Sequence, residues 1–363
     1  MSVYSWLVVL ILLAGLLLGG NTKRNKKFII VAFLLMFCVM GLRDAYSVGN
    51  DSATSYWHQY KHIEDTDTAE ETDDNYNFAF NYVMKVIYNA SDGDYQFFLT
   101  LVSAFILLCY VRFVWKYSPS PLQSILYFFG LLYFTFMFDA LKQAIAMSIL
   151  LFAFDAIIER RAGKFVVMVL LAACFHYPAL IFLPAYWIAK LNVNRSYLLL
   201  LAILLAITYF LRDEILNLMI KAYGGDEINS TMDGITFLRN KVIVMIVIVV
   251  AALILRPYSR DDVVYNTLLK FMGMAIIFQT FCGYDNIFER LADYYFVFSM
   301  VFIPMVFDTK TDGKHRLEEK SDNLLKNTAT LTFCGFAIWR FITVIEASSF
   351  LMPYKFFFQS TLK

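Results

Sequence analysis

Residues 95–113 read YQFFLTLVSAFILLCYVRF, and this stretch decides the fold. It carries one charged side chain, Arg112, close to its end. A helix needs about 20 mostly apolar residues to cross the hydrocarbon core of a bilayer, so the stretch predicts a transmembrane helix. Similar apolar runs recur along the chain, at residues 2–19, 27–42, 122–138, 141–158, 196–211, 242–255, 263–282, 291–307 and 325–345.

The composition of the whole chain is typical of a membrane protein. Apolar residues make up 60% of the 363 residues and charged residues only 17%, whereas soluble domains carry about 25% charged residues. The net charge of +1 gives no basic field for nucleic acid. No C-x-x-C pair and no nucleotide-binding or hydrolase signature is present. We therefore predict an all-α polytopic membrane protein of about 10–12 transmembrane helices, with no metal, no cofactor and no nucleic-acid partner.

Basic residues in short loops orient the bundle, because such loops remain in the cytoplasm. The basic loops 21–27, 112–116 and 160–164 are separated by pairs of predicted spans, so all three can lie inside. The acidic segment 43–94 then lies outside. We predict a single transmembrane domain over residues 1–363. Its extracytoplasmic loops are 43–94 and 212–241, and they contain short helices. Its cytoplasmic linker loop is 308–326.

One further apolar stretch, 165–189, is interrupted by His176, Pro178 and Pro184. If it crosses the membrane once, the basic loop 308–326 lies outside. If it enters and returns, that loop lies inside with the other basic clusters, as the distribution of positive charge favours. We therefore predict a broken or re-entrant segment here, with His176 near its outer turn.

Polar groups gather at four places on the predicted outer side, where ionisable residues next to membrane spans indicate function. An arginine there could form two parallel hydrogen bonds to a phosphate through its planar guanidinium. At a helix start, the free backbone N–H groups add to the attraction of a cation for anions. Each place also has an ordinary interpretation, such as a snorkelling cation, a charged corner, a hydrogen-bonded core histidine or an interfacial aromatic belt. The four places contain Arg43 with Asp51 and Tyr56, Lys142 with Gln143, His176, and Arg290 with Asp285, Tyr294 and Tyr295.

Three cations and one histidine on one side of an apolar bundle suit a site for a lipid-linked diphosphate. The diphosphate is the leaving group, so positive charge that stabilises its departure lowers the barrier. A neutral histidine such as His176 could take the proton from an attacking sugar hydroxyl, and Asp51 is its rival or its orienting partner.

These patterns resemble those of the EpsG-type polysaccharide polymerases, relatives of the Wzy polymerases. Four motifs occur in the order typical of that family, between residues 41 and 304. Lys142 stands where the family usually has arginine, which keeps the charge and loses the bidentate fork. The matching segments are Gly41-Leu-Arg43 with Gly49-Asn-Asp51 and Tyr56, Lys142-Gln143-Ala-Ile-Ala146, Phe175-His176-Tyr-Pro-Ala179-Leu180, and Arg290-Leu-Ala-Asp-Tyr294-Tyr295-Phe296.

The resemblance implies a fold like that of the C-type glycosyltransferases and a metal-independent polymerase in the bacterial cytoplasmic membrane. Its substrate would be an undecaprenyl-diphosphate-linked oligosaccharide, joined on the extracytoplasmic side into capsule, exopolysaccharide or O-antigen, with a flippase and a chain-length regulator as possible partners. The diphosphate contacts would be Arg43, Lys142 and Arg290. His176 or Asp51 would be catalytic, and contacts to sugar or lipid would come from Gln143, Tyr56, Asp285, Tyr294 and Tyr295. The alternatives are a lipid-linked oligosaccharide flippase, an O-antigen-ligase-like enzyme and a sugar acyltransferase.

Overall fold

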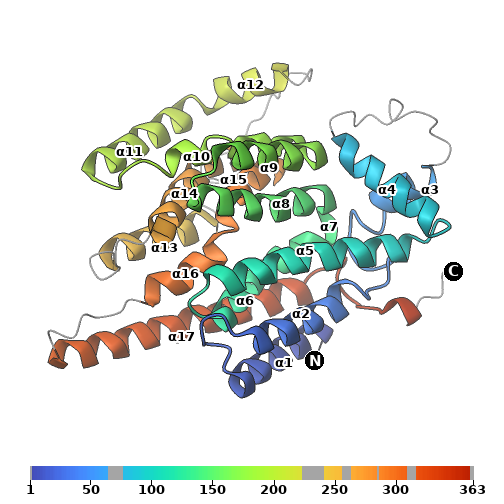
Figure 1. Cartoon of the computed structure of the whole chain (residues 1–363), viewed down its shortest axis with the longest axis horizontal. Coiled ribbons are helices and arrows are strands. Elements are labelled where there is room, and N and C mark those ends of the chain that lie inside the picture. Colours follow the sequence, from blue (N-terminus) through green and yellow to red (C-terminus); the bar gives the residue numbers. More distant parts are fainter. Residues whose placement is uncertain are drawn as a thin grey trace. The chain divides into compact units, whose positions relative to one another are not determined.

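The computed structural model describes residues 2–63, 77–222, 241–255, 263–283, 286–308 and 316–359. The described residues form helices and no β-strand, which confirms the predicted all-α fold. They group into two compact units (Figure 1). Unit 1 comprises Met1–Leu180 and Gly313–Lys363, and unit 2 comprises Ile181–Asp312. The prediction of one membrane domain stays a prediction.

Unit 1 is a bundle in which the long helix α5 packs against α2 on one side and α8 on another. Local signals set several helix starts: the side chains of Asn25 and Asp94 cap α2 and α5, and Pro121 opens α6. The predicted loop helices are present as α3 and α4. The helices of unit 1 are α1 (Val3–Leu18), α2 (Lys26–Met40), α3 (Ser55–Lys61), α4 (Phe78–Ala90), α5 (Tyr95–Tyr117), α6 (Pro121–Gly130), α7 (Tyr133–Asp139), α8 (Leu141–Ile158), α9 (Ala162–Phe175) and α17 (Arg316–Glu346).

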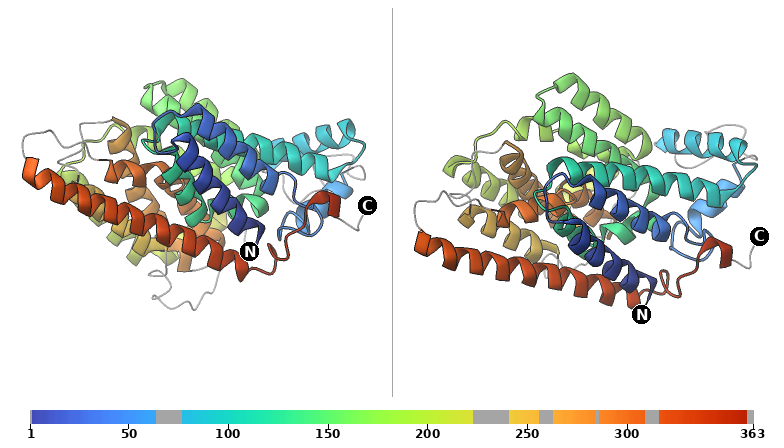
Figure 2. Two further views of the ribbon diagram at one scale, coloured as in Figure 1. Left: turned by 90° about the horizontal axis from the view of Figure 1, so that it is seen from below. Right: turned by 60° about the horizontal axis from the view of Figure 1, so that its bottom comes forward.

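Helix α17 is distant in sequence from the other helices of unit 1 and packs against two of them. It lies along α6 and α1 (Figure 2), and the ring of Phe341 stacks on Phe129 of α6. Nearer its start, the Cys334 thiol donates to the Tyr127 hydroxyl. Residue numbers therefore rise together along the two helices, and α17 runs parallel to α6.

Unit 2 is built around α14. Helix α13 packs antiparallel to α14, because the Tyr265 hydroxyl at the start of α14 donates to the carbonyl of Ala252 near the end of α13. Helices α15 and α16 are also antiparallel to α14. Tyr295 of α15 stacks on Phe278 near the end of α14, and Phe302 of α16 packs on Tyr265 near its start. The elements of unit 2 are α10 (Ala185–Ile188), α11 (Arg195–Phe210), α12 (Arg212–Ala222), α13 (Lys241–Leu255), α14 (Val263–Gln279), η5 (Thr280–Gly283), α15 (Asn286–Phe296) and α16 (Ser299–Phe307).

Three of the described helices are long and apolar enough to cross a membrane: Tyr95–Tyr117, Leu141–Ile158 and Asn327–Glu346. Two bent pairs could each form one further span, Pro121–Gly130 with Tyr133–Asp139 at 55° and Arg290–Phe296 with Ser299–Phe307 at 44°. The predicted runs 122–138 and 291–307 are thus bent rather than straight helices. Shorter apolar helices are Val3–Leu18, Ala162–Phe175, Tyr177–Ile188, Arg195–Phe210, Lys241–Ile254 and Val263–Gln279.

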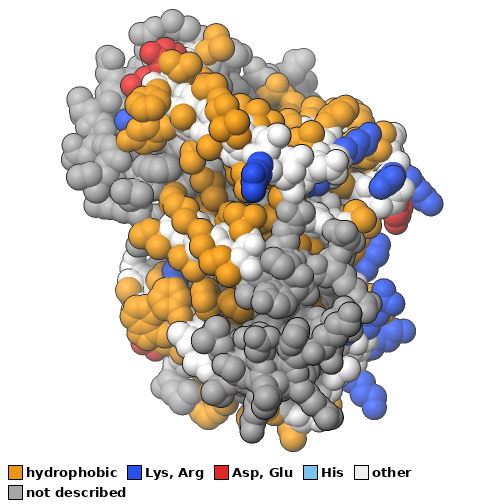
Figure 3. Space-filling model, turned by 90° about the vertical axis from the view of Figure 1, so that its left-hand side faces the viewer, with side chains coloured by type: hydrophobic (Ala, Val, Ile, Leu, Met, Phe, Trp, Pro, Cys, Tyr) orange, Lys and Arg blue, Asp and Glu red, His pale blue; other side chains and the backbone are white. Residues whose placement is uncertain are grey.

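The outward faces of these helices are apolar. Leu16 and Leu17 of α1 are 74% and 82% exposed, and Ile30 of α2 is 58% exposed. Figure 3 shows hydrophobic side chains over much of one face, interrupted by Lys and Arg. A soluble protein rarely exposes so many large apolar side chains along its helices, whereas lipid tails would cover them.

The bend between α6 and α7 has a packing cause. A Cβ atom on Gly130 would lie 2.3 Å from the Cβ of Ala337 in α17, so this close helix approach requires glycine. Leu132 then takes a left-handed backbone with φ 66°, which turns the chain into α7. The guanidinium of Arg340 donates a hydrogen bond to the Gly130 carbonyl at the break, as breaks at membrane depth require.

The predicted interruption within 165–189 is confirmed at His176. Helix α9 ends at Phe175, His176 is extended with φ −153° and ψ 103°, and the chain resumes as the 3₁₀-helix η2 (Tyr177–Phe182). Within unit 2, the arm from Ile181 to Ala189 packs on α15 and α14. The Ile181 carbonyl accepts from Tyr295, and the Ala189 carbonyl accepts from Lys270.

Candidate functional site

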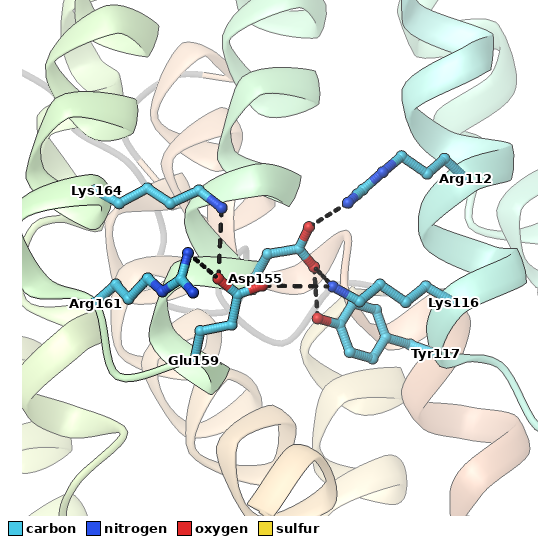
Figure 4. A network of polar contacts seen from close by, with 7 residues as sticks. All are labelled: Arg112, Lys116, Tyr117, Asp155, Glu159, Arg161 and Lys164. Atoms are coloured by element: carbon cyan, nitrogen blue, oxygen red, sulfur yellow. Dashed lines mark hydrogen bonds and ion pairs between the residues drawn. The ribbon is translucent and has the colours of Figure 1, made fainter.

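One end of unit 1 is basic. Asp155 of α8 is 2% exposed and accepts hydrogen bonds from Arg112, Lys116 and Tyr117 of α5, the Lys116 contact being 2.9 Å long. Glu159, one turn further along α8, lies 3.5 Å from both Arg161 and Lys164 (Figure 4). Four cations surround two carboxylates here, so the net charge of the cluster is positive.

The first basic loop lies at the same end. The Trp115 indole nitrogen of α5 donates to the carbonyl of Arg24 at 3.1 Å, and the Lys26 ammonium lies 5.7 Å from the Trp115 ring centre. The three loops predicted to be cytoplasmic, 21–27, 112–116 and 160–164, therefore meet at one end of unit 1. The candidate site residues of unit 1 lie toward the opposite end of the same helices.

Arg43 follows α2 at that opposite end and is fully buried. Its guanidinium donates to the carbonyl of Met40, to the carbonyl of Phe138 at 3.1 Å and weakly to the Ser103 hydroxyl at 3.4 Å. It also lies 4.6 Å from the centre of the Phe138 ring, a cation–π contact. In this conformation Arg43 thus joins the ends of α2 and α7 to α5, and its predicted phosphate contact stays a prediction.

The turn that carries Asp51 is held by Asp139, the last residue of α7. The Asp139 carboxylate accepts a hydrogen bond from the backbone N–H of Asn50 at 2.5 Å. Gly49 has φ 109°, and a Cβ there would meet the hydroxyl of Ser52 and the Asp139 carboxylate. Glycine is therefore required at this turn for both conformation and space. Nothing in the sequence indicated Asn50 as the partner of Asp139.

Lys142 lies in the first turn of α8, beside two aromatic rings from the acidic segment 43–94. Its ammonium lies 5.9 Å from the centre of Tyr56 and 5.5 Å from that of Phe80, and these rings are 5.4 Å apart. The structure thus brings together the predicted residues Lys142 and Tyr56. Gln143, the next residue, is 2% exposed and faces the protein interior.

Helix α4 connects Lys142 with the His176 region. Phe80 in its first turn contacts Lys142, while the side chain of Asn77, just before the helix, accepts from the backbone N–H of Tyr177 at 3.3 Å. His176 itself is partly exposed and lies at the end of α9. The acidic segment 43–94 therefore supplies the residues that link two predicted site segments.

A C-terminal segment, residues 348–359, covers the Arg43 turn, which the sequence did not predict. Arg43 and Phe356 form an isolated antiparallel β-bridge. The Asp44 N–H donates to the Lys355 carbonyl at 2.9 Å, and the Tyr354 hydroxyl donates to the Val39 carbonyl at 2.7 Å. Contacts between segments 300 residues apart leave no local signal in a single sequence.

In unit 2, Arg290 lies on α15 and is partly exposed. One turn later Asp293 is 2% exposed and forms an ion pair with Lys241 of α13 at 2.8 Å, a cation that sequence reasoning did not single out. Tyr294 and Tyr295 are buried, and the Tyr295 hydroxyl donates to the Ile181 carbonyl. Their sugar or lipid contacts stay predictions, and Asp285 lies outside the described residues.

A comparison with protein families decides the kind of protein. Residues 26–356 match the model of the EpsG family. The chain belongs to the EpsG family. No curated protein and no solved structure matches it.

Membership of the EpsG family identifies an integral membrane protein of polysaccharide biosynthesis, of the polysaccharide-polymerase type. The matched range contains Arg43, Asp51, Lys142, His176 and Arg290, and it extends to Phe356 in the C-terminal segment. Within the described residues of this EpsG-family chain, no three metal-ligating side chains come together.

Proposed function

We propose that this protein polymerises undecaprenyl-diphosphate-linked oligosaccharide repeat units into a surface polysaccharide. A sugar hydroxyl of one lipid-linked unit attacks the anomeric carbon of the reducing-end sugar on another. A new glycosidic C–O bond forms, the bond from that carbon to the diphosphate breaks, and the hydroxyl proton passes to a base. Undecaprenyl diphosphate leaves with the electron pair. The glycosyl–diphosphate bond supplies the driving force, so no nucleotide is consumed.

The observation that carries this proposal is the match to the EpsG family over residues 26–356, which includes each proposed site segment. The local chemistry supports it. Lys142 offers a cation at a helix start, with the Tyr56 ring beside it, and the Asp51 turn is fixed through Asp139 at the preceding helix end. Positive charge placed where the diphosphate leaves would stabilise the transition state.

We assign Arg43, Lys142 and Arg290 to the diphosphate. His176 is the preferred base, with Asp51 as its rival or orienting partner, because a base must reach the acceptor hydroxyl and be neutral or anionic at working pH. Lys142 carries a point charge without a planar fork, so it would pair with one phosphate oxygen at a time. Contacts with sugar or lipid are assigned to Gln143, Tyr56, Asp285, Tyr294 and Tyr295.

We place the reaction on the extracytoplasmic side of a bacterial cytoplasmic membrane. The basic end of unit 1 matches the cytoplasmic side by the distribution of positive charge, and Arg43 and Lys142 lie toward the other end. Helix α17 runs parallel to α6 and so starts at the basic end, which supports a cytoplasmic loop 308–326.

The number of passes supports a return of the chain at His176. Helix α9 ends on the outer side and α17 begins on the inner side, so an odd number of passes must lie between them. Counting the arm 177–188 as a separate pass gives five, together with α11, α13, α14 and the bent pair α15–α16. Counting 165–189 as one crossing leaves four, which would put the start of α17 outside.

The test is a set of variants in the purified protein supplied with a defined lipid-linked repeat unit. We expect His176→Ala and Lys142→Ala to lower polymer formation by about 10²-fold or more, the size of effect seen when a catalytic base or an electrostatic donor is removed. Matched controls are His58→Ala and Lys85→Ala, which change the same residue types at exposed positions of the outer loop. Normal polymer from both site variants, at wild-type protein levels, would refute the assignment.

A further inference from the structure

The C-terminal segment, residues 348–359, is held to the turn after α2 mainly through backbone groups. The Phe357 N–H donates to the Leu42 carbonyl at 3.0 Å, and the Gly49 N–H donates to the Phe350 carbonyl at 2.9 Å. With the Asp44–Lys355 bond, these contacts pair the segment with the whole stretch from Leu42 to Gly49. The segment thereby lies over the stretch that carries the first family motif.

Beneath this segment Arg43 is a buried cation whose hydrogen bonds, among the described residues, go to neutral oxygen atoms. It has 0% exposure, and its Nε atom has no hydrogen-bond partner among the described residues. The described residues also give it no ion pair with a carboxylate; the carboxylate of Asp139 is directed to the Asn50 N–H. A buried charge held by neutral acceptors is less favourable than one bonded directly to an anion, and an anionic ligand would supply that partner.

The segment itself has the properties of a part that can move. The described residues after α17 contain one short 3₁₀-helix, Phe357–Gln359. Phe357 and Phe358 are 44% and 67% exposed, so few apolar contacts hold its tip. Segments outside the packed helices, with exposed side chains and few buried contacts, open at a lower free energy than the core.

We propose that residues 348–359 form a cover over the diphosphate site, which the lipid-linked diphosphate displaces when it binds. This rests on the proposed function and names the step that admits its donor. When the cover leaves, phosphate oxygens take the place of the Met40 and Phe138 carbonyls at Arg43, and charge-assisted bonds replace neutral ones. The buried arginine thereby gains a directly bonded anion in place of neutral acceptors.

A permanent brace is the opposing interpretation, in which the same bonds hold the turn at every stage of the reaction. Hydrogen–deuterium exchange of the full chain in nanodiscs separates the two. The probes are undecaprenyl diphosphate and, as control, undecaprenol, which has the same tail and no charge. We expect undecaprenyl diphosphate alone to speed exchange in peptides covering 348–359 about tenfold or more, because the bonded amides of the cover become open to water. Unchanged or slower exchange would overturn the proposal.

A reversible lock gives the second test. Leu42 and Phe357 are neighbours across the β-bridge, a spacing that a disulfide can span, so the double variant Leu42→Cys, Phe357→Cys can be closed by oxidation. We expect the oxidised form to bind undecaprenyl diphosphate at least about tenfold more weakly and to recover on reduction. The single variant Phe357→Cys, treated identically, is the control for the native cysteines. Full binding by the locked form would refute the cover.

The two tests also separate this inference from the proposed function. If the locked and open forms polymerise equally well, the cover is wrong while the polymerase activity stands. If undecaprenyl diphosphate releases the segment but no repeat units are joined, the polymerase assignment fails while the cover stands.

Discussion

Gly130→Ala tests the packing that bends the α6–α7 span and brings Phe138 and Asp139 to the site. The new methyl group would lie 2.3 Å from the Cβ of Ala337, 2.5 Å from its Cα and 2.9 Å from its carbonyl oxygen. Carbon atoms in contact are normally separated by about 3.5–4.0 Å. Backbone atoms cannot rotate away, so α6 and α17 must separate. We expect the variant to lose about 1–3 kcal/mol of stability, the usual cost of overpacking a core.

Gly335→Ala provides a matched control on the partner helix. Nothing lies within 4 Å of the position where its methyl group would be added, and alanine favours a helix over glycine by about 1 kcal/mol. Thermal unfolding in detergent, followed by intrinsic fluorescence, compares the two variants. A shift of roughly 1–2 °C per kcal/mol is expected for a chain of 363 residues, downward for Gly130→Ala and level or upward for Gly335→Ala. Equal melting temperatures for Gly130→Ala and the wild type would refute the packing argument.

Further predictions concern the outer turn, the basic end and the topology. Asp139→Ala removes the acceptor of the Asn50 N–H and should cost about 1 kcal/mol of stability and lower polymer yield. Asp139→Asn keeps an acceptor oxygen and should be milder in both assays. Asp155→Ala leaves Arg112, Lys116 and Tyr117 without their shared acceptor and should destabilise by about 1–3 kcal/mol. Glu159→Ala removes only partly exposed ion pairs and should cost less than about 1 kcal/mol; the reverse order in thermal unfolding would contradict the network. A reporter that is active only in the cytoplasm should give a signal when inserted in loop 308–326 and no signal when inserted in segment 43–94. Loss of the signal from loop 308–326, with the protein present at wild-type levels, would contradict the return of the chain at His176.

The helices could be predicted from sequence because local rules set them. The run 141–158 is the helix Leu141–Ile158, and the break predicted from His176 and Pro178 lies where α9 ends. The bend at Gly130 could not be predicted, since the apolar run 122–138 is continuous. Its cause is the approach of Ala337, a residue about 200 positions away whose contact no local pattern records.

The candidate site was predicted in part for the same reason. Lys142 and Tyr56 were both singled out by motif, and they meet in the structure. The burial of Arg43 was not foreseen, and neither was its β-bridge with Phe356 in residues 348–359, which carry no motif of their own. The partnership of Asp139 with Asn50 was also missed, as a carboxylate at a helix corner has many possible acceptor roles. Chemistry-bearing residue types are visible in sequence, whereas the contacts that position them are long-range.

Incubation of the purified protein with a single defined undecaprenyl-diphosphate-linked repeat unit tests the central claim most directly, with products resolved by size. The account predicts a ladder of polymers that differ by whole repeat units. It also predicts release of one undecaprenyl diphosphate for each unit joined, and loss of both with Lys142→Ala but not with Lys85→Ala. A substrate that stays one unit long while the protein is folded and binds it would contradict the claim.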